Sequence, residues 1–285
     1  MKLDPADVAR IRNHLLGPQA AALIDYMFRL NIGGDAAAIP GPVRETARDL
    51  GWTDAADRLT DTGGFVADSC REYMFWLDRD RALPFAGADG LTAGYFAGRS
   101  VLEVGAGMGA NLMSLSATVT DLAGVEPMPV YAQIGDILRE REGLPPVGIR
   151  TGSGENIPFP DARFDVALCV TAHQYMDIRP ALGELARVLK PGGELIIIGG
   201  TLDRYLRDAA ASFPSNLKAH LITTLNTLAY TLLHRRIIPS KGTATTSRPI
   251  YPMPKTMKKW MTNAGINPQN KTQKIDTETI LKGKK

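Results

Sequence analysis

Cysteine is scarce in this chain, with only Cys70 and Cys169 among 285 residues. Two cysteines cannot form the disulfide framework of a small secreted protein, so we expect a reducing compartment, the cytoplasm. The histidines are scattered, and neither HxxxH nor CxxC spacing occurs, so we expect no metal site. No apolar run approaches the ~18 residues of a membrane span, and the charged N-terminal segment is unlike a signal peptide.

Charge is unevenly distributed along the chain. The net charge is +3, but residues 241–285 hold ten Lys or Arg against two acids, a local charge of +8 that leaves −5 for the remainder. A basic segment of this kind can bind nucleic acid or anionic lipid, although a solvated surface is the commoner cause. The length suits one large α/β domain, or a medium domain with a substantial appendage.

The pattern of residues 1–98 is helical, and we expect a helical N-terminal region that acts as a lid. Asp4 followed by Pro5 indicates a helix start, and apolar residues then recur at helical spacing until the glycines at 33 and 34. Two more helices are expected at residues 43–50 and 65–77. The last carries three clustered aromatic side chains that could cover a cofactor or acceptor, although such clusters more often belong to a core: Tyr73, Phe75 and Trp76.

From residue 99 the pattern changes to short apolar runs that alternate with helical segments. This alternation is typical of βαβ units around a parallel sheet. The expected strands are residues 100–104, 121–125, 148–151, 164–170 and 194–198, and the expected helices are 110–116, 129–141 and 180–189. We therefore predict an α/β fold, with a doubly wound Rossmann-like domain over residues 99–285.

Residues 201–250 interrupt this pattern with a helical insert. Leucines at spacings of three or four predict an amphipathic helix there: Leu217, Leu221, Leu225, Leu228 and Leu232. After the insert we expect a helix at residues 254–264. Two last strands, which are poorly apolar, are expected around Lys274 and Ile280.

The strongest chemical signal is a glycine-rich turn after the first strand, with glycines at 105, 107 and 109. Glycine lets the backbone tighten and lets a ligand approach the main chain. The spacing is GxGxG, whereas the dinucleotide fingerprint is GxGxxG. Glu103 precedes the turn, and a carboxylate ~4 Å from a phosphate charge would cost on the order of 4 kcal/mol. A ligand with an ammonium and a sulfonium reverses that sign, unless Glu103 only caps a neighbouring turn.

A second acid lies at the end of the second strand. Glu126 follows Glu103 at about the twenty-residue separation expected of an acid that binds ribose hydroxyls. Pro127 then turns the chain, and Met128 could lie against an adenine face. The alternative is that Glu126 is a solvated loop acid.

Three further stretches have the sequences GENIPFPDARFDV (residues 154–166), TAHQYMD (171–177) and RVLKPGG (187–193). Together with the glycine turn, they resemble the class I S-adenosylmethionine-dependent methyltransferases, particularly the ubiquinone-biosynthesis-like subgroup. The resemblance covers residues 95–200 well and 250–285 loosely. It implies S-adenosylmethionine as cofactor and a seven-stranded sheet with a final antiparallel strand.

The resemblance also implies roles by position. Glu103 would face the methionine part of the cofactor, Glu126 would hold the ribose, and the Thr171 carbonyl would accept from the ammonium group. Ser153 stands where the family usually has an Asp that accepts from the adenine amino group, a bond that a hydroxyl can accept more weakly. With the Tyr73 lid, the expected cofactor contacts are Tyr73, Glu103, Gly105, Ala106, Gly107, Glu126, Pro127, Met128, Ser153, Gly154, Glu155 and Thr171.

Methyl transfer from a sulfonium is an in-line displacement, in which the protein mainly positions the nucleophile and excludes water. His173 could be a general base for a hydroxyl or amine acceptor, or could only order its loop, and Tyr175 is a second candidate. No Asn/Asp-Pro-Pro-Tyr/Phe motif follows the fourth strand, which disfavours methylation of nucleobase amino groups. Cys169 lies within an apolar strand and is expected to be a core residue.

We predict methyl transfer to a small-molecule acceptor at O, N, C or S. The helical regions would then enclose the acceptor, with Tyr205, Phe213, Tyr230 and Tyr251 as candidate lining residues. One alternative is an RNA methyltransferase that uses the basic C-terminal segment, although nucleic acid is the less expected partner. Another is a non-catalytic protein that binds S-adenosylmethionine. The sequence predicts neither the acceptor nor an oligomeric state.

Overall fold

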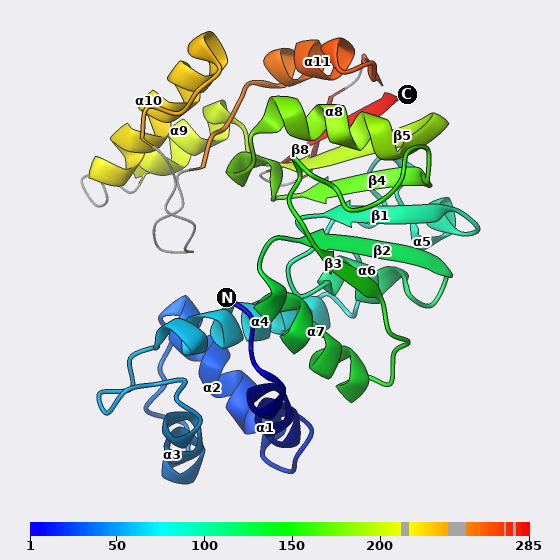
Figure 1. Cartoon of the computed structure of the whole chain (residues 1–285). Helices are drawn as coiled ribbons and strands as arrows, with labels where there is room; N and C mark the ends of the chain where they lie inside the picture. Colours follow the sequence, from blue (N-terminus) through cyan, green and yellow to red (C-terminus); the bar gives the residue numbers. More distant parts are fainter. Residues whose placement is uncertain (212–216, 239–248, 271, 276–277) are drawn as a thin grey trace. The chain divides into compact units, whose positions relative to one another are not determined.

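The computed structural model describes residues 1–211, 217–238, 249–270, 272–275 and 278–285. The chain forms two compact units, both discontinuous in sequence (Figure 1). The first comprises Met1–Gly98 and Ala106–Gly152, and the second comprises Arg99–Gly105 and Ser153–Lys285. The chain therefore passes from one unit to the other three times: just before β1, within the glycine turn, and in the segment before Gly154.

The first unit begins with four helices, α1 (Pro5–Leu15), α2 (Ala20–Ile32), α3 (Gly41–Asp49) and α4 (Asp61–Asp78). Asp4 caps α1 as predicted, because its side chain accepts from the N–H of Asp7. The expectation of one helix from there to residue 33 is wrong. Gly17 and Pro18 separate α1 from α2, since proline lacks the N–H that a continuous helix needs.

These helices share one apolar core with α6 (Ala110–Leu115) and α7 (Pro129–Arg141) of the same unit. Trp52 and Trp76 of the N-terminal region are buried in this core with Ile134 of α7. The unit also contains α5 (Ala93–Phe96) and two parallel paired strands, β2 (Asp121–Glu126) and β3 (Gly148–Thr151). The N-terminal helices therefore pack against α6 and α7, which belong to the α/β part of the same unit.

The second unit contains β1 (Ser100–Val104), β4 (Phe164–Val170), β5 (Leu189–Gly199) and β8 (Glu278–Lys284), side by side in that order. The pairings of β1 with β4 and of β4 with β5 are parallel, whereas β8 is antiparallel to β5. Two short strands, β6 (Asn267–Pro268) and β7 (Gln273–Ile275), also pair with β8. The helices α8 (Ile178–Val188) and α11 (Pro254–Asn263) belong to this unit.

The predicted fold class is confirmed, because the chain combines a mixed sheet with flanking helices in a Rossmann-like α/β arrangement. Each of the seven predicted strands has a counterpart, and the last long strand is antiparallel. Among the described residues the structure adds only the two-residue strand β6. All five residues of β1 are buried, which explains why its apolar residues, Val101, Leu102 and Val104, do not alternate with exposed polar ones.

The described part of the insert contains two helices, α9 (Leu202–Ala211) and α10 (Leu217–Leu233). The five leucines that predict α10 lie on its exposed face, while its buried residues are Thr223, Asn226, Thr227, Ala229 and Tyr230. Within the part of the chain that the structure describes, no helix has the length and apolar character needed to cross a bilayer.

Candidate functional site

The glycine-rich turn after β1 is built from backbone conformations that favour glycine. Gly105, Gly107 and Gly109 have φ angles of 76°, 55° and 85°, in the left-handed region that other residues rarely adopt. Gly109 is the N-cap of α6, and the N–H of Ala106 donates to the carbonyl of Val125 at 3.0 Å. The glycine spacing therefore has a geometric cause.

In the first unit, Glu126 fastens this turn to the end of β2. Its Oε2 accepts from the N–H of Gly107 at 3.0 Å, and its Oε1 accepts from the N–H of Met128 at 3.0 Å. The residue is 7% exposed; burial raises the pKa of its carboxyl, and the two backbone bonds act against that shift. Each carboxylate oxygen has two acceptor positions, so Glu126 can also accept from hydroxyls. Pro127, the next residue, is exposed, and Met128 is half-buried.

Glu72 of α4 is a further carboxylate at this turn, which the sequence analysis missed. A Cβ placed on Gly107 would lie 3.1 Å from Oε2 of Glu72. Partial burial raises the pKa of Glu72 to about 7; Arg71 opposes this shift, and the charges of Asp68 and Glu126 add to it. An acid on a helix is common in any sequence, so no local signal could have identified this one.

Tyr73, a predicted cofactor contact, lies in the helical core of the first unit. Its ring stacks on Trp76 with centroids 6.0 Å apart, and its hydroxyl donates to the carboxylate of Glu142. Trp76 is buried and donates to the hydroxyl of Ser114 at 3.0 Å, whereas Phe75 is 43% exposed. Helix α4 thus approaches Gly107 through the side chain of Glu72 and not through Tyr73. A cofactor contact by Tyr73 stays a prediction.

In the second unit, Glu103 is enclosed within the sheet. It is 1% exposed and pairs in register with Leu168 of β4. Burial, with the charge of Glu103 added, raises the pKa of the Cys169 thiol to about 12. Cys169 is therefore a protonated core cysteine, as its place in an apolar strand predicts.

Met176 packs against two of the predicted cofactor glycines and was missed by the sequence analysis. A Cβ on Gly154 would lie 2.5 Å from its Sδ, and a Cβ on Gly105 would lie 3.3 Å from its Cε. The Gly105 position would also meet the Cβ of Ala172, at 2.3 Å. Within this unit the fold therefore brings Gly105, Gly154 and the loop after β4 together.

The loop after β3 is tied to the start of α8. Ser153 forms a bridge with Asn156, and the carboxylate of Glu155 accepts from the N–H of Asp177, the N-cap residue of α8. Ser153 and Glu155 are half-buried. Their contact with adenine stays a prediction, but the loop that carries them is fixed by these bonds.

Thr171, at the end of β4, has a strained backbone. Its φ of 51° lies in the left-handed region, which a β-branched residue avoids. Its N–H donates to the carbonyl of Ile198 at 2.7 Å, which holds this conformation against β5. Backbone strain at non-glycine residues occurs mainly at functional sites. The strain at Thr171 is consistent with a functional role, and binding of an ammonium group by its carbonyl stays a prediction.

The two candidate catalytic residues have different surroundings. His173 is 6% exposed, and its ring packs on Gly199, where a Cβ would lie 2.5 Å from Cε1. Among the described residues its Nδ1 has no hydrogen-bond partner, and burial lowers its pKa to about 4, so the imidazole is neutral at pH 7. Tyr175 is 50% exposed.

Two of the candidate acceptor-lining residues stack on each other: the rings of Tyr205 and Tyr251 have centroids 4.8 Å apart. Tyr230 is buried, and its hydroxyl donates to the carboxylate of Asp177. Phe213 lies outside the described residues. Across the described ranges, no three His, Cys, Asp or Glu side chains are grouped so as to hold a metal ion.

Residues 102–197 match the methyltransferase domain family. This part of the chain is therefore similar to methyltransferase domains. Over 99 residues it is 33% identical to the uncharacterized methyltransferase YcgJ of Bacillus subtilis, an alignment that covers 34% of this chain and 39% of that protein. Over 105 residues it is 36% identical to the demethylmenaquinone methyltransferase of Tropheryma whipplei, covering 36% and 43%. The chain thus spans less than half the length of these relatives.

Solved structures show the same fold at low sequence identity. An S-adenosyl-L-methionine-dependent methyltransferase candidate from Methanococcus maripaludis is similar with a TM-score of 0.51 and 16% identity, over 79% of this chain and 93% of that one. A chain of the complex between the Haloferax volcanii Trm112 methyltransferase activator and a candidate methyltransferase is similar with a TM-score of 0.53 and 15% identity, over 79% and 97%.

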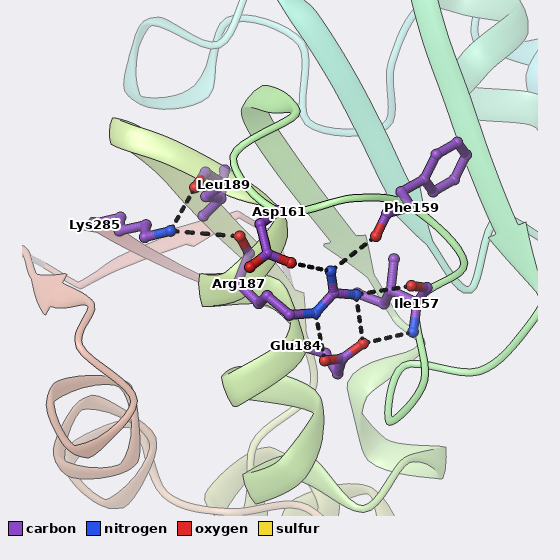
Figure 2. A network of polar contacts seen from close by, with 7 residues as sticks. All are labelled: Ile157, Phe159, Asp161, Glu184, Arg187, Leu189 and Lys285. Carbon is purple, nitrogen blue, oxygen red and sulfur yellow. Dashed lines mark hydrogen bonds and ion pairs between the residues drawn. The ribbon is translucent and has the colours of Figure 1, made fainter.

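Within the matched residues 102–197, Arg187 holds the segment that follows Glu155 in place (Figure 2). Its guanidinium donates to the carbonyls of Ile157 at 2.9 Å and Phe159 at 2.8 Å, and to the carboxylates of Asp161 and Glu184. Glu184 in turn accepts from the N–H of Ile157 at 2.9 Å. Two of the stretches that resemble the family are therefore held together by one side chain.

Proposed function

We propose that this protein transfers a methyl group from S-adenosylmethionine to a small-molecule acceptor. The supporting observation is the pair of acidic side chains at Gly107: Glu126 accepts from its N–H, and a Cβ on Gly107 would lie 3.1 Å from an oxygen of Glu72. Negative charge at a glycine turn favours a ligand with an ammonium and a sulfonium. The same charge opposes the pyrophosphate of a dinucleotide.

The residues of each unit suit a part of this cofactor. In the first unit, Glu126 keeps acceptor positions for ribose hydroxyls, and its bond to Met128 fixes the start of α7. In the second unit, the Thr171 carbonyl suits an ammonium group. Bound there, S-adenosylmethionine would supply a methyl group on a sulfonium, which is an activated leaving group.

The state of His173 favours a reaction that depends on positioning rather than on proton abstraction. A buried imidazole with a pKa of about 4 is a weak base at pH 7, and its packing on Gly199 suits a positioning residue. Holding the acceptor in line with the methyl group can contribute ~7–11 kcal/mol to catalysis. We expect His173→Asn to change the rate at saturating cofactor by less than about tenfold. A loss of two or more orders of magnitude would assign the base role to His173.

Cofactor binding can be tested by calorimetry on the full chain. We expect S-adenosylmethionine and S-adenosylhomocysteine to bind and NAD not to bind. Glu126→Ala should weaken S-adenosylhomocysteine binding by about one to two orders of magnitude, because both ribose acceptors and the bond to Gly107 are lost. Glu45→Ala, at an exposed position of α3, is the control. NAD binding, or unchanged affinity in Glu126→Ala, would contradict the proposal.

A second candidate function is RNA methylation, favoured by one observation. Residues 209–275 contain ten Lys or Arg and no Asp or Glu. Binding to RNA phosphates should be strong at low salt and should weaken steeply as salt is added. Negligible gel-shift affinity for tRNA and rRNA at low salt would eliminate this candidate.

The acceptor can be sought by incubating the protein with a labelled methyl donor and fractions of cell extract. Transfer of label to a metabolite fraction supports the small-molecule proposal. Cofactor binding without transfer to any fraction would instead favour a non-catalytic binding protein.

A further inference from the structure

Helix α10 has an apolar exposed face. Five leucines that fall within about 80° of one another on a helical projection are exposed by 45% to 74% of their area. Thirteen large hydrophobic side chains are exposed in the described residues, and seven of them lie between Leu217 and Ile237. Such a concentration marks an interaction surface rather than the scattered apolar residues of any protein surface.

The orientation of α10 is fixed by polar contacts on its other face. The Asn226 amide donates to the carbonyl of Ile238 at 2.8 Å and accepts from the N–H groups of Ile237 and Ile238. The Tyr230 hydroxyl contacts the carboxylate of Asp177, and the N–H of Arg179 donates to it at 3.2 Å. Turning the leucines inward would leave these buried polar groups without partners, which is costly.

The sequence that carries this leucine face is basic, and the carboxylate of Asp177 contacts α10 at Tyr230, on the opposite face. No acid occurs between Asp208 and Asp276 in the sequence. A cavity of about 400 Å³ adjoins the last turns of α10, and its charged or titratable lining residues are Arg179, His234, Lys255 and Lys259. No carboxylate lines this cavity among the described residues.

We propose that α10 docks on an anionic phospholipid bilayer. The leucine face lies in the interface, and the cations of the cavity face the phosphate headgroups. With 17 residues and a polar face committed to its own unit, α10 lies on the membrane and does not cross it. Positive charge around the face opposes its pairing with a second copy of the chain and favours a negatively charged surface. This inference does not depend on the proposed methyl transfer.

The test is sedimentation of the full chain, without cofactor, with vesicles of phosphatidylcholine alone or mixed with phosphatidylglycerol. We expect binding to the mixed vesicles at low salt, weaker binding at high salt, and little binding to phosphatidylcholine alone. Replacing Leu221, Leu225 and Leu228 together by Gln should reduce partitioning by at least about tenfold. The matched control is Ile32→Gln, because Ile32 of α2 is 50% exposed and Leu225 is 51% exposed.

A second pair of variants addresses the headgroups. Lys255→Gln combined with Lys259→Gln should reduce binding to the anionic vesicles at low salt by about tenfold, and Lys2→Gln, at an exposed position in the first unit, should not. The proposal is overturned if the wild-type chain does not sediment with anionic vesicles, or if the triple Gln variant sediments equally well. It is also overturned if analytical ultracentrifugation shows a dimer that the triple variant dissociates, because the occupant would then be a second copy. Circular dichroism checks that each variant is folded.

Discussion

Burial without a hydrogen bond at Nδ1 sets the charge of His173. Its pKa in the folded chain is about 4, against 6.5 for an ordinary histidine. Between these two values the unfolded chain binds a proton that the folded chain does not, so folding stability is lost as the pH falls through this range. At neutral pH no such loss occurs.

We therefore expect His173→Asn to flatten the acid branch of the stability profile. The wild-type chain should lose up to about 3 kcal/mol of unfolding free energy from this group between pH 6.5 and 4. Glu72, whose raised pKa acts in the opposite direction, is present in both proteins and cancels in the comparison. Urea denaturation at pH 7 and pH 5 measures the difference.

His173→Gln serves as a second variant, because it is also neutral at both pH values. Equal losses on acidification in the wild type and in both variants would show that His173 does not carry this dependence. A lower stability of the variants at pH 7 would not affect the test, since only the change with pH is compared.

Residues whose role follows from chain position could be predicted from the sequence, and residues whose role follows from packing could not. Glu126 ends a strand at a recognisable separation from the glycine turn, and the structure shows it bound to that turn. Glu72 and Met176 reach their glycines only through the fold. The strained φ of Thr171 likewise leaves no trace in the sequence.

At the scale of elements, α7 depends on a glycine for its close packing. A Cβ on Gly135 would lie 2.0 Å from the carbonyl oxygen of Met108, a backbone atom that cannot move aside without shifting the glycine turn. Gly183 of α8 is exposed, and a Cβ there would meet nothing within 4 Å. Both glycines lie within helices, but only Gly135 has a neighbouring atom that leaves no room for a side chain.

We expect Gly135→Ala to destabilise the chain by about 2–3 kcal/mol because of overpacking. Gly183→Ala should stabilise it by about 0.5–1 kcal/mol, since alanine restricts the unfolded chain and favours the helix. Thermal or chemical denaturation of both variants measures the pair. Equal effects of the two substitutions would contradict the close approach of α7 to Met108.

Strands and helices of the α/β pattern could be predicted because burial on both faces produces short continuous apolar runs. The break between α1 and α2 was missed although Gly17 and Pro18 mark it, because the apolar spacing continues across both residues. The leucine spacing predicted α10 correctly, but spacing alone does not say which face is buried. In α10, hydrogen bonds of Asn226 and Tyr230 determine that choice.

At the scale of the whole molecule, the boundary expected at residue 98 does not separate two cores. Met113, Ile134 and Leu138 pack in the same core as the N-terminal helices. The sequence could not show this, because an apolar helix face looks the same whether it packs on a sheet or on other helices.

A chain shortened to residues 99–285 should therefore expose the apolar residues of α6 and α7 that pack against α1 and α4. We expect it to aggregate or to lose a cooperative thermal transition, as monitored by light scattering and circular dichroism. A shortened chain that melts cooperatively and binds S-adenosylhomocysteine as tightly as the full chain would show that the helices are a separable appendage.

The absence of glutamate from the sequence on either side of α10 also determines how proteases cut the chain. An endoprotease specific for glutamate has no site between Glu194 and Glu278, so it releases this part as one long peptide, whereas trypsin has many sites within it. Comparing the two digests with and without vesicles would therefore map which lysines and arginines a lipid surface shields, residue by residue, without any substitution.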